Sequence, residues 1–405
     1  MHSSYYIALE EKYGAHNYHP LPVVIGKAKG CEMWDVEGKR YFDFLSGYSA
    51  VNQGHCHPII TNALIEQVTL LTLTSRAFYN DKLGLFEKYI TELLGFEKML
   101  PMNTGAEAVE TAIKLARRWA YVKKGIEENN AKIIVCADNF HGRTSTIVSF
   151  STDPSSYSKF GPYMPGFEVI PYNDLHALEE KLKDKNVAGF LFEPIQGEAG
   201  IIMPDQGYLT KVRELCTSHQ VLMMADEIQT GLCRTGKMMA CDHENIQPDL
   251  LLLGKALSGG TMPISAVLAN DEVMLTIQPG EHGSTFGGNP LASVVGMASL
   301  KVLVEENMAD NAEKMGILFR ELLHQIQSPF IREIRGKGLM NAIEINHPNP
   351  NAAWTLCERF MQNGLLAKPT HGDKIRLTPP LVINAEQITE AIGIIHQSLP
   401  VLESL

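Results

Sequence analysis

Two short apolar runs, each closed by a charged residue, constrain the fold more than any other part of the chain. Residues 221–225 (VLMMA) lead directly into Asp226, and residues 250–253 (LLLL) lead through Gly254 into Lys255. Uninterrupted apolar runs of this length are typical of strands buried on both faces, as in a parallel α/β sheet. The carboxyl ends of parallel strands meet at one edge, and α/β proteins bind their ligands there. We therefore expect Asp226 and Lys255 to lie close together at one edge of a sheet.

This pair of side chains favours one cofactor. Enzymes that use pyridoxal 5'-phosphate bind it covalently through a lysine, and a carboxylate pairs with its ring nitrogen. Lys255 and Asp226 would supply both groups over an apolar floor, and we expect them to be the catalytic pair. The alternative is a structural ion pair, or two separate charges at solvated strand ends.

A longer stretch around these residues resembles the signature of the class III aminotransferases, the ornithine and 4-aminobutyrate type. It contains ADEIQTG at 225–231, RTG at 234–236, PD at 248–249 and GKALSGG at 254–260. The resemblance extends over nearly the whole chain. It implies an α/β fold, fold type I of the pyridoxal-phosphate-dependent transferases. Such a fold has a large domain around a mostly parallel seven-stranded sheet, a smaller α+β C-terminal domain and an N-terminal segment.

The resemblance also implies where the chain divides. Residues 1–45 would form the N-terminal arm and strands of the small domain. Residues 46–295 would form the large cofactor-binding domain, and residues 296–405 the C-terminal small domain.

A loop of small residues opens an amphipathic helix near residue 104. The free N–H groups and the positive dipole at a helix N-terminus hold phosphate well. A Thr-Gly start alone would indicate only a helix cap. Because this loop matches the NTGAEA loop of the family, we expect it to hold the cofactor phosphate. The family also places a polar loop, EHGSTFGGNP at 281–290, across a dimer interface at the partner's phosphate. The expected phosphate ligands are Thr104, Gly105, Ala106, Ser284 and Thr285.

Three further residues are expected around the cofactor ring. Phe140 follows the apolar run at 132–137, and an aromatic side chain there can stack on a planar ring. The resemblance places Ile228 on the opposite face and Gln229 at the phenolic oxygen. Core packing is the alternative for Phe140.

Five residues are expected to bind substrate. A lone arginine in an edge strand is usually a surface charge, but the resemblance makes Arg376, in RLTPP at 376–380, the expected clamp for a substrate carboxylate. The resemblance also places Glu198 at the site, where it would neutralise Arg376 when the substrate presents an amine. Arg143 and Tyr18 would hold the far carboxylate and amine of ornithine. Tyr18 and Tyr48 match the pocket tyrosines of the ornithine-specific members of the family. His141 replaces an aromatic residue found in other members.

The implied reaction transfers the δ-amino group of L-ornithine to 2-oxoglutarate in two alternating half-reactions. Acetylornithine or 4-aminobutyrate as donor is the nearest alternative. A decarboxylase, epimerase or aminomutase on the same fold is another, and a binding protein without activity is a third. The sequence at 55–57, His-Cys-His, matches no usual zinc spacing, so no metal is expected.

Composition excludes several classes of partner. The net charge of −11 argues against nucleic acid and gives no support to binding of anionic membranes. Seven scattered cysteines indicate reduced, intracellular usage, and no apolar run approaches the ~20 residues of a membrane span. The N-terminus shows no secretory signal. We expect a cytoplasmic homodimer that binds small amino acids and oxo acids.

Overall fold

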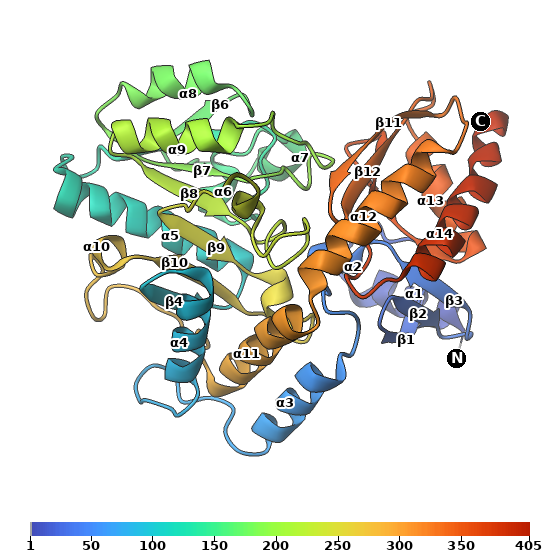
Figure 1. The fold of residues 1–405 in the computed structure, drawn as a ribbon, viewed down its shortest axis with the longest axis horizontal. Coiled ribbons are helices and arrows are strands. Elements are labelled where there is room, and N and C mark those ends of the chain that lie inside the picture. The colour runs from blue at the N-terminus through green and yellow to red at the C-terminus, as the bar shows by residue number, and fades with distance from the viewer. Residues whose placement is uncertain (1) are drawn as a thin grey trace.

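The computed structural model describes residues 2–405. A seven-stranded sheet forms the centre of one lobe, and two four-stranded sheets form the other lobe (Figure 1). The strands of the central sheet, in spatial order, are β4 (Lys98–Met102), β10 (Ser265–Ala269), β9 (Leu250–Leu253), β8 (Leu222–Asp226), β7 (Val187–Phe192), β5 (Lys132–Cys136) and β6 (Phe167–Ile170).

Only one strand of the central sheet is reversed. β10 runs antiparallel to both of its neighbours, and every other adjacent pair of strands is parallel. The mostly parallel seven-stranded sheet expected from the sequence is therefore confirmed. The strand expected at 221–225 is shifted by one residue in the structure, because β8 begins at Leu222 and ends at Asp226.

The central sheet is buried on both faces because its strands are apolar on both sides. In β5, Ile133 and Val135 pack with α5 (Gly105–Trp119), whereas Ile134 and Cys136 pack under α8 (Leu175–Leu182) and α9 (Tyr208–Ser218). Helices thus cover both faces, as parallel sheets require. Further helices of this lobe and its links are α3 (Pro58–Val68), α4 (Leu83–Leu94), α6 (Ser145–Val148), α7 (Pro154–Tyr157), α10 (Asp271–Met274) and α11 (Pro290–Glu305).

The second lobe joins the two ends of the chain. In one sheet, β13 (Leu365–Leu366) pairs with β3 (Arg40–Asp43), which continues to β2 (Glu32–Asp35) and β1 (Ile25–Lys29). The other sheet has the order β11 (Ile331–Lys337), β12 (Met340–Ile345), β15 (Lys374–Leu377) and β14 (Lys368–Thr370), and it is antiparallel throughout. Its helices are α12 (Met308–His324), α13 (Ala352–Asn363) and α14 (Ala385–Ser398).

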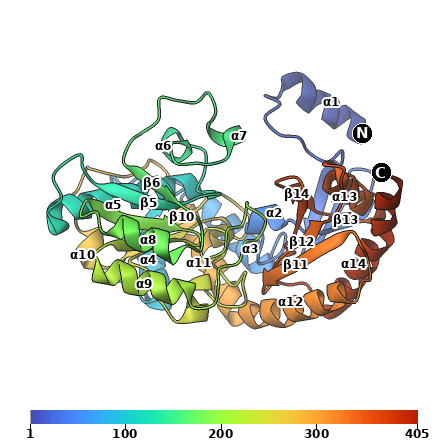
Figure 2. The same cartoon turned by 90° about the horizontal axis from the view of Figure 1, so that it is seen from above.

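The N-terminal helix has no core of its own. α1 (Ser3–Tyr13) contains no buried residue and stands clear of the rest of the chain in Figure 2. Its contact with the body includes the bond from the Ser3 hydroxyl to Glu37 at 2.6 Å. Among residues 2–405, no helix is long and apolar enough to cross a bilayer. The domain borders at 45/46 and 295/296 stay predictions.

Gly316→Ala should destabilise the second lobe. A methyl group at this position in α12 would lie 1.8 Å from the carbonyl oxygen of Gly338, at the turn between β11 and β12. Overpacking of this kind costs about 1–3 kcal/mol. Denaturant unfolding of the purified protein checks the loss of stability.

Gly393→Ala is the matched control. Gly393 lies inside α14 with no atom within 4 Å of the added methyl group. It should gain about 0.5–1 kcal/mol, because alanine loses less backbone entropy in a helix. Equal effects of the two substitutions would contradict this account of the packing.

Candidate active site

Lys255 stands where β9 ends. The strand stops at Leu253, Gly254 is extended, and Lys255 has φ of 44° at the start of the short helix η3 (Lys255–Ser258). Burial lowers the pKa of the Lys255 amine, while Glu198 and Asp226 act in the opposite direction. A lowered pKa favours the neutral amine, which is the form that attacks a carbonyl. The side chain lines a cavity of about 410 Å³ that also borders Thr104 and Gly105.

Asp226 ends the neighbouring strand and is almost fully buried. Its Oδ1 accepts the N–H of Ile228 at 3.1 Å, and its Oδ2 lies 2.6 Å from Nδ1 of His141. Since β8 and β9 are adjacent and parallel, Asp226 and Lys255 reach the same sheet edge. The arrangement expected for these two residues is present.

The N-terminus of α5 could hold the phosphate of a cofactor. Thr104 caps the helix: its hydroxyl accepts the N–H of Glu107 at 3.2 Å, and Glu107 accepts the N–H of Thr104 at 2.9 Å. The first N–H groups of the helix, on Gly105 and Ala106, have no acceptor within the helix. Ser284 lies beside this loop and accepts the side-chain amide of Asn103 at 2.9 Å. Thr285 is exposed.

The floor of the site is closely packed around Ile228. A methyl group on Gly105 would lie 3.1 Å from Ile228, and one on Gly254 would lie 3.3 Å from it. Glycine at both places lets the backbone approach the Ile228 side chain. Gln229 is buried beside the Gly197 backbone. A methyl group on Gly197 would collide with the Oε1 atom of Gln229.

These groups fit pyridoxal phosphate. Lys255, whose pKa is lowered, and the free N–H groups at the start of α5 border one cavity. The buried carboxylate of Asp226 lies on the next strand, at the same edge of the sheet. Phe140 is half-buried, with Arg143 at 5.8 Å from its ring centroid. Arg143 is otherwise exposed.

Three of the five residues expected to bind substrate meet: Glu198 and Tyr48 both contact Arg376. This side chain is 3% exposed, and its Nη1 donates to Oε1 of Glu198 at 2.5 Å. The guanidinium lies over the ring of Tyr48, 5.0 Å from the centroid. The pairing expected between Glu198 and Arg376 is therefore present. Burial alone would raise the pKa of Glu198, but Arg376 outweighs it and the pKa is lowered.

Tyr48 reaches Arg376 through an unusual backbone turn. All four residues of α2 (Ser46–Ser49) have positive φ, from 51° at Ser46 to 69° at Ser49. A left-handed turn costs roughly 1–2 kcal/mol for each residue other than glycine. Ser46 compensates in part, because its hydroxyl donates to the carbonyl of Thr378 at 2.7 Å. Sequence patterns did not indicate this turn.

Tyr18 lies at the rim of the site. It is 74% exposed, on a segment held by Lys368, which donates to the carbonyl of His19 at 2.9 Å. The His19 ring also stacks on Trp354, with 4.5 Å between centroids. This segment places Tyr18 near Tyr48.

Two buried residues of the site were not expected from the sequence. His141 contacts Asp226, and Glu193 accepts the N–H groups of Phe140 at 2.9 Å and Gly197 at 3.1 Å. Burial raises the pKa of Glu193 to about 7. Both residues follow the carboxyl end of an apolar run, and this position was the signal that could have identified them.

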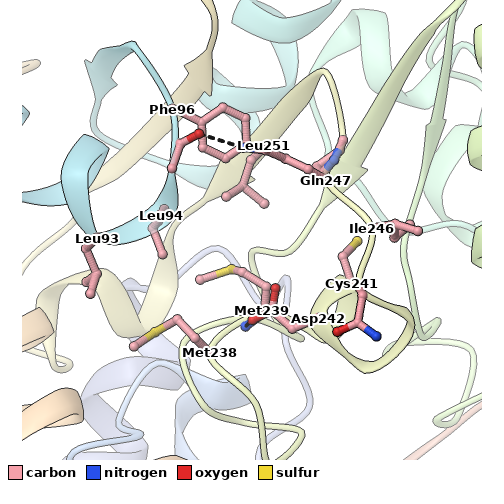
Figure 3. A pocket seen from close by; sticks show the side chains of 13 residues that line it. Leu93, Leu94, Phe96, Met238, Met239, Cys241, Asp242, Ile246, Gln247 and Leu251 are labelled. Carbon is pink, nitrogen blue, oxygen red and sulfur yellow. Dashed lines mark hydrogen bonds between the residues drawn. The ribbon is translucent and has the colours of Figure 1, made fainter.

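A second cavity, of about 340 Å³, contains none of the expected site residues (Figure 3). Leucine, methionine and phenylalanine side chains line much of it, and Gln247 closes one side by donating to the carbonyl of Gly95 at 2.7 Å.

The chain belongs to the class-III aminotransferases, since the sequence model of that family matches residues 13–399. It is a transaminase that depends on pyridoxal phosphate. It is 62% identical to the mitochondrial ornithine aminotransferase of Rattus norvegicus, over 98% of this chain and 90% of the relative.

Two solved structures extend the comparison. The ornithine aminotransferase of Toxoplasma gondii ME49 superimposes with a TM-score of 0.98 at 48% identity, covering 100% of this chain and 96% of the other. The acetylornithine aminotransferase of Elizabethkingia anophelis superimposes with a TM-score of 0.91 at 56% identity, covering 98% and 99%.

Lys255→Ala should abolish turnover and leave the fold intact. The lysine would both anchor the cofactor and move a proton, so its loss should leave less than about a thousandth of the wild-type rate. The variant should still bind the cofactor without a covalent bond, through the phosphate pocket and Asp226. Steady-state kinetics and equilibrium dialysis with pyridoxal phosphate measure both properties. Near-normal turnover would contradict the assignment of Lys255.

Proposed function

We propose that this chain transfers the δ-amino group of L-ornithine to 2-oxoglutarate. The products are glutamate and glutamate-5-semialdehyde, which cyclises to pyrroline-5-carboxylate. The observation that carries the proposal is the Glu198–Arg376 ion pair, with the guanidinium over the ring of Tyr48. 2-Oxoglutarate presents a carboxylate near Arg376, whereas ornithine presents an amine there. The two substrates therefore need opposite charges at the same place, and the ion pair can supply both charges.

Each residue then has a defined task. Bound pyridoxal phosphate supplies an electron sink for the negative charge that develops on the substrate carbon. Asp226 would hold positive charge at the ring nitrogen, and Phe140 and Ile228 would confine the ring. Lys255 Nζ accepts a proton from the reacting carbon of the donor and returns one to the acceptor. Its lowered pKa makes the neutral amine available for the first transfer.

The ion pair distinguishes the two substrates. With ornithine, Glu198 neutralises Arg376, so the guanidinium does not repel the incoming amine. With 2-oxoglutarate, the substrate carboxylate replaces Glu198 and can accept two parallel bonds from the guanidinium of Arg376. Tyr18 and Arg143 would hold the far carboxylate and amine of ornithine.

Acetylornithine is the second candidate donor. The Elizabethkingia anophelis structure, at 56% identity, is that of an acetylornithine aminotransferase. Tyr18 favours ornithine, because its hydroxyl can accept a bond from a free α-amine, whereas acetylation leaves only one N–H. Single-turnover absorbance with each donor separates the candidates, and a preference for acetylornithine or 4-aminobutyrate over ornithine would overturn the proposal.

Glu198→Ala should change donor choice. An unpaired Arg376 in a partly dry site should disfavour ornithine by about 1–3 kcal/mol, or roughly 5- to 150-fold, and favour glutamate as donor. Rapid-mixing absorbance of each half-reaction measures the change separately. Equal changes in both half-reactions would contradict the proposed role of the ion pair.

Glu32→Ala is the matched control for this experiment. Glu32 also pairs with an arginine, Arg40, at 2.6 Å, but it lies on β2 and is not one of the expected site residues. Its loss should leave both half-reactions unchanged.

The proposed assembly is a homodimer with a shared phosphate site. Large apolar side chains are exposed on α3, on the start of α4 and between them, more than a soluble monomer normally shows in one region. These are Ile59, Ile65, Val68, Leu70, Leu71, Phe78, Tyr79 and Leu85. The loop at 281–290 adjoins them, because Gly288 lies against Leu83. A second copy covering this surface would bring Thr285 to its partner's phosphate.

The predicted cytoplasmic location is also part of the proposal, although the rat relative is named mitochondrial.

Thr285→Ala should weaken retention of the cofactor, because a ligand shared between subunits ties cofactor affinity to association. Mixing Thr285→Ala with Lys255→Ala subunits tests which subunit supplies the threonine. In a hybrid dimer, one site has an intact lysine and an intact partner threonine, so activity should return. Failure of the hybrid to recover, or full activity of a monomer, would contradict the shared site.

A further inference from the structure

The loop that carries Glu198 leaves β7 of the large lobe but is anchored on the second lobe. This Glu198 loop spans residues 196–202, and its two ends pair with each other through N–H to carbonyl bonds of 3.0 and 3.2 Å. Near its tip, Ile201 has φ of 59° and is fully buried, in an apolar cluster that includes Ala342 of β12. The tip therefore packs on the antiparallel sheet that also contains Arg376.

Arg335 of β11 binds the backbone of the Glu198 loop. Its Nη2 donates to the carbonyl of Gly200 at 2.9 Å, and its Nε donates to the carbonyl of Ile201 at 3.0 Å. Its Nη1 donates to Glu333 at 2.5 Å and to Glu344 at 3.1 Å. All three guanidinium nitrogens thus have acceptors, and the side chain is only 11% exposed. A lysine has a single nitrogen and could not bind both carbonyls and both carboxylates in this geometry.

Arg335 and Arg376 lie in one row across the sheet. Arg335 in β11 is the cross-strand partner of Ala342 in β12, and Ala342 is also the partner of Arg376 in β15. Cross-strand partners project from the same face of a sheet, so only the small side chain of Ala342 stands between the two arginines. The Glu198 loop spans this row, because its Gly200 carbonyl binds Arg335 and its Glu198 carboxylate binds Arg376.

Thr370 of β14 holds the loop at a second point. Its hydroxyl donates to the carbonyl of Glu198 itself at 2.6 Å. β14 pairs with β15, the strand of Arg376. The backbone of Glu198 is therefore fixed by the same sheet that carries the arginine bound by its carboxylate.

We propose that Arg335 is a positioning residue that determines donor choice through Glu198. By binding two backbone carbonyls of the loop, it keeps the Glu198 carboxylate in contact with Arg376. Arg335 does not touch the substrate in this role. The inference rests on the proposed function, in which the Glu198–Arg376 pair sets the charge that a substrate meets.

The physical reason is the short range of the ion pair. Attraction between charges falls with distance, and a charge-assisted hydrogen bond requires a donor and an acceptor about 2.7–2.9 Å apart. If the loop loosens, the Glu198 carboxylate spends less time against Arg376, and the guanidinium presents more positive charge to the substrate. This change repels the amine of ornithine and attracts a carboxylate. The charge of Arg335 itself is compensated by its two glutamate partners.

The test uses a dicarboxylate that does not react. Glutarate has the two carboxylates of 2-oxoglutarate but no keto group to accept an amine. Arg335→Lys keeps the positive charge and loses the paired bonds to the loop. Titration of the holoenzyme with glutarate, followed by the absorbance of the bound cofactor, gives a dissociation constant that is independent of turnover.

Arg335→Lys should bind glutarate about fivefold more tightly than wild type, because the competing Glu198 carboxylate is held less well. In rapid-mixing experiments, its half-reaction with ornithine should slow by a similar factor, whereas its half-reaction with glutamate should not slow. Thr370→Val should act in the same direction. Thr370→Ser keeps the hydroxyl and should behave like wild type. A variant that only damages the fold would instead bind glutarate more weakly.

The Glu198→Ala background tests whether Arg335 acts through Glu198. Once the carboxylate is removed, Arg335→Lys should cause no further change in glutarate affinity or in donor choice. An equal effect of Arg335→Lys in both backgrounds would overturn the proposal. Weaker or unchanged glutarate binding by the single variant would overturn it as well.

Arg320→Lys is the matched control. Arg320 of α12 also binds a backbone carbonyl of the second lobe, that of Gly338 at 2.9 Å, at the turn between β11 and β12. This variant should leave glutarate affinity and donor choice unchanged. An effect equal to that of Arg335→Lys would show a general loosening of the lobe and count against the proposal.

Failure of this inference can be told apart from failure of the proposed function. A wild-type preference for acetylornithine would overturn the proposed donor alone, because acetylornithine presents the same δ-amine to the ion pair. If Glu198→Ala leaves donor choice unchanged, the role of the ion pair falls and this inference falls with it. If donor choice changes in Glu198→Ala but not in Arg335→Lys, only this inference is overturned.

Discussion

The arrangement of the two lobes depends on one buried guanidinium. Arg234 is fully buried, and its bonds go to uncharged acceptors: the side-chain oxygen of Asn52 at 2.6 Å, and the carbonyls of Leu339 at 2.9 Å and Pro379 at 2.6 Å. Burial lowers its pKa to about 9, while Asp43 acts to raise it. Removal of the acceptors would leave a buried charge uncompensated, which is strongly destabilising.

Two of those three acceptors lie on segments that form the substrate side of the site. Asn52 follows the left-handed turn of Tyr48, and Pro379 follows the strand of Arg376. Leu339 lies in the turn against which Gly316 packs. Arg234 itself comes from the loop after β8, which also carries Asp226. The guanidinium therefore sets the distance between the cofactor side and the substrate side.

Local patterns predicted the strands β5, β8 and β9, because these strands are buried on both faces, whereas the seven-stranded sheet was expected from the family resemblance. They also placed Asp226 and Lys255, since parallel neighbours end at one edge. The contact between His141 and Asp226 could not be predicted in this way, because it passes over β7 between strands that are not adjacent. The left-handed turn at 46–49 depends on a bond to Thr378, which is remote in sequence. Tyr18 and Thr285 lie at the rim, where a second chain would decide their contacts.

The loop that carries Glu198 determines which motion is needed to open the Glu198–Arg376 pair. It leaves β7 of the large sheet, but Arg335 of the small lobe binds the carbonyl of Gly200 at 2.9 Å, and Thr370 binds that of Glu198 at 2.6 Å. Glu198 and Arg376 therefore move together with the same lobe, and rotation of one lobe against the other leaves their distance unchanged. Under the proposed function, the pair would open by rotation of the Glu198 side chain, without the domain motions that take microseconds to milliseconds. The change of charge between the two substrates thus does not have to wait for any movement of the lobes.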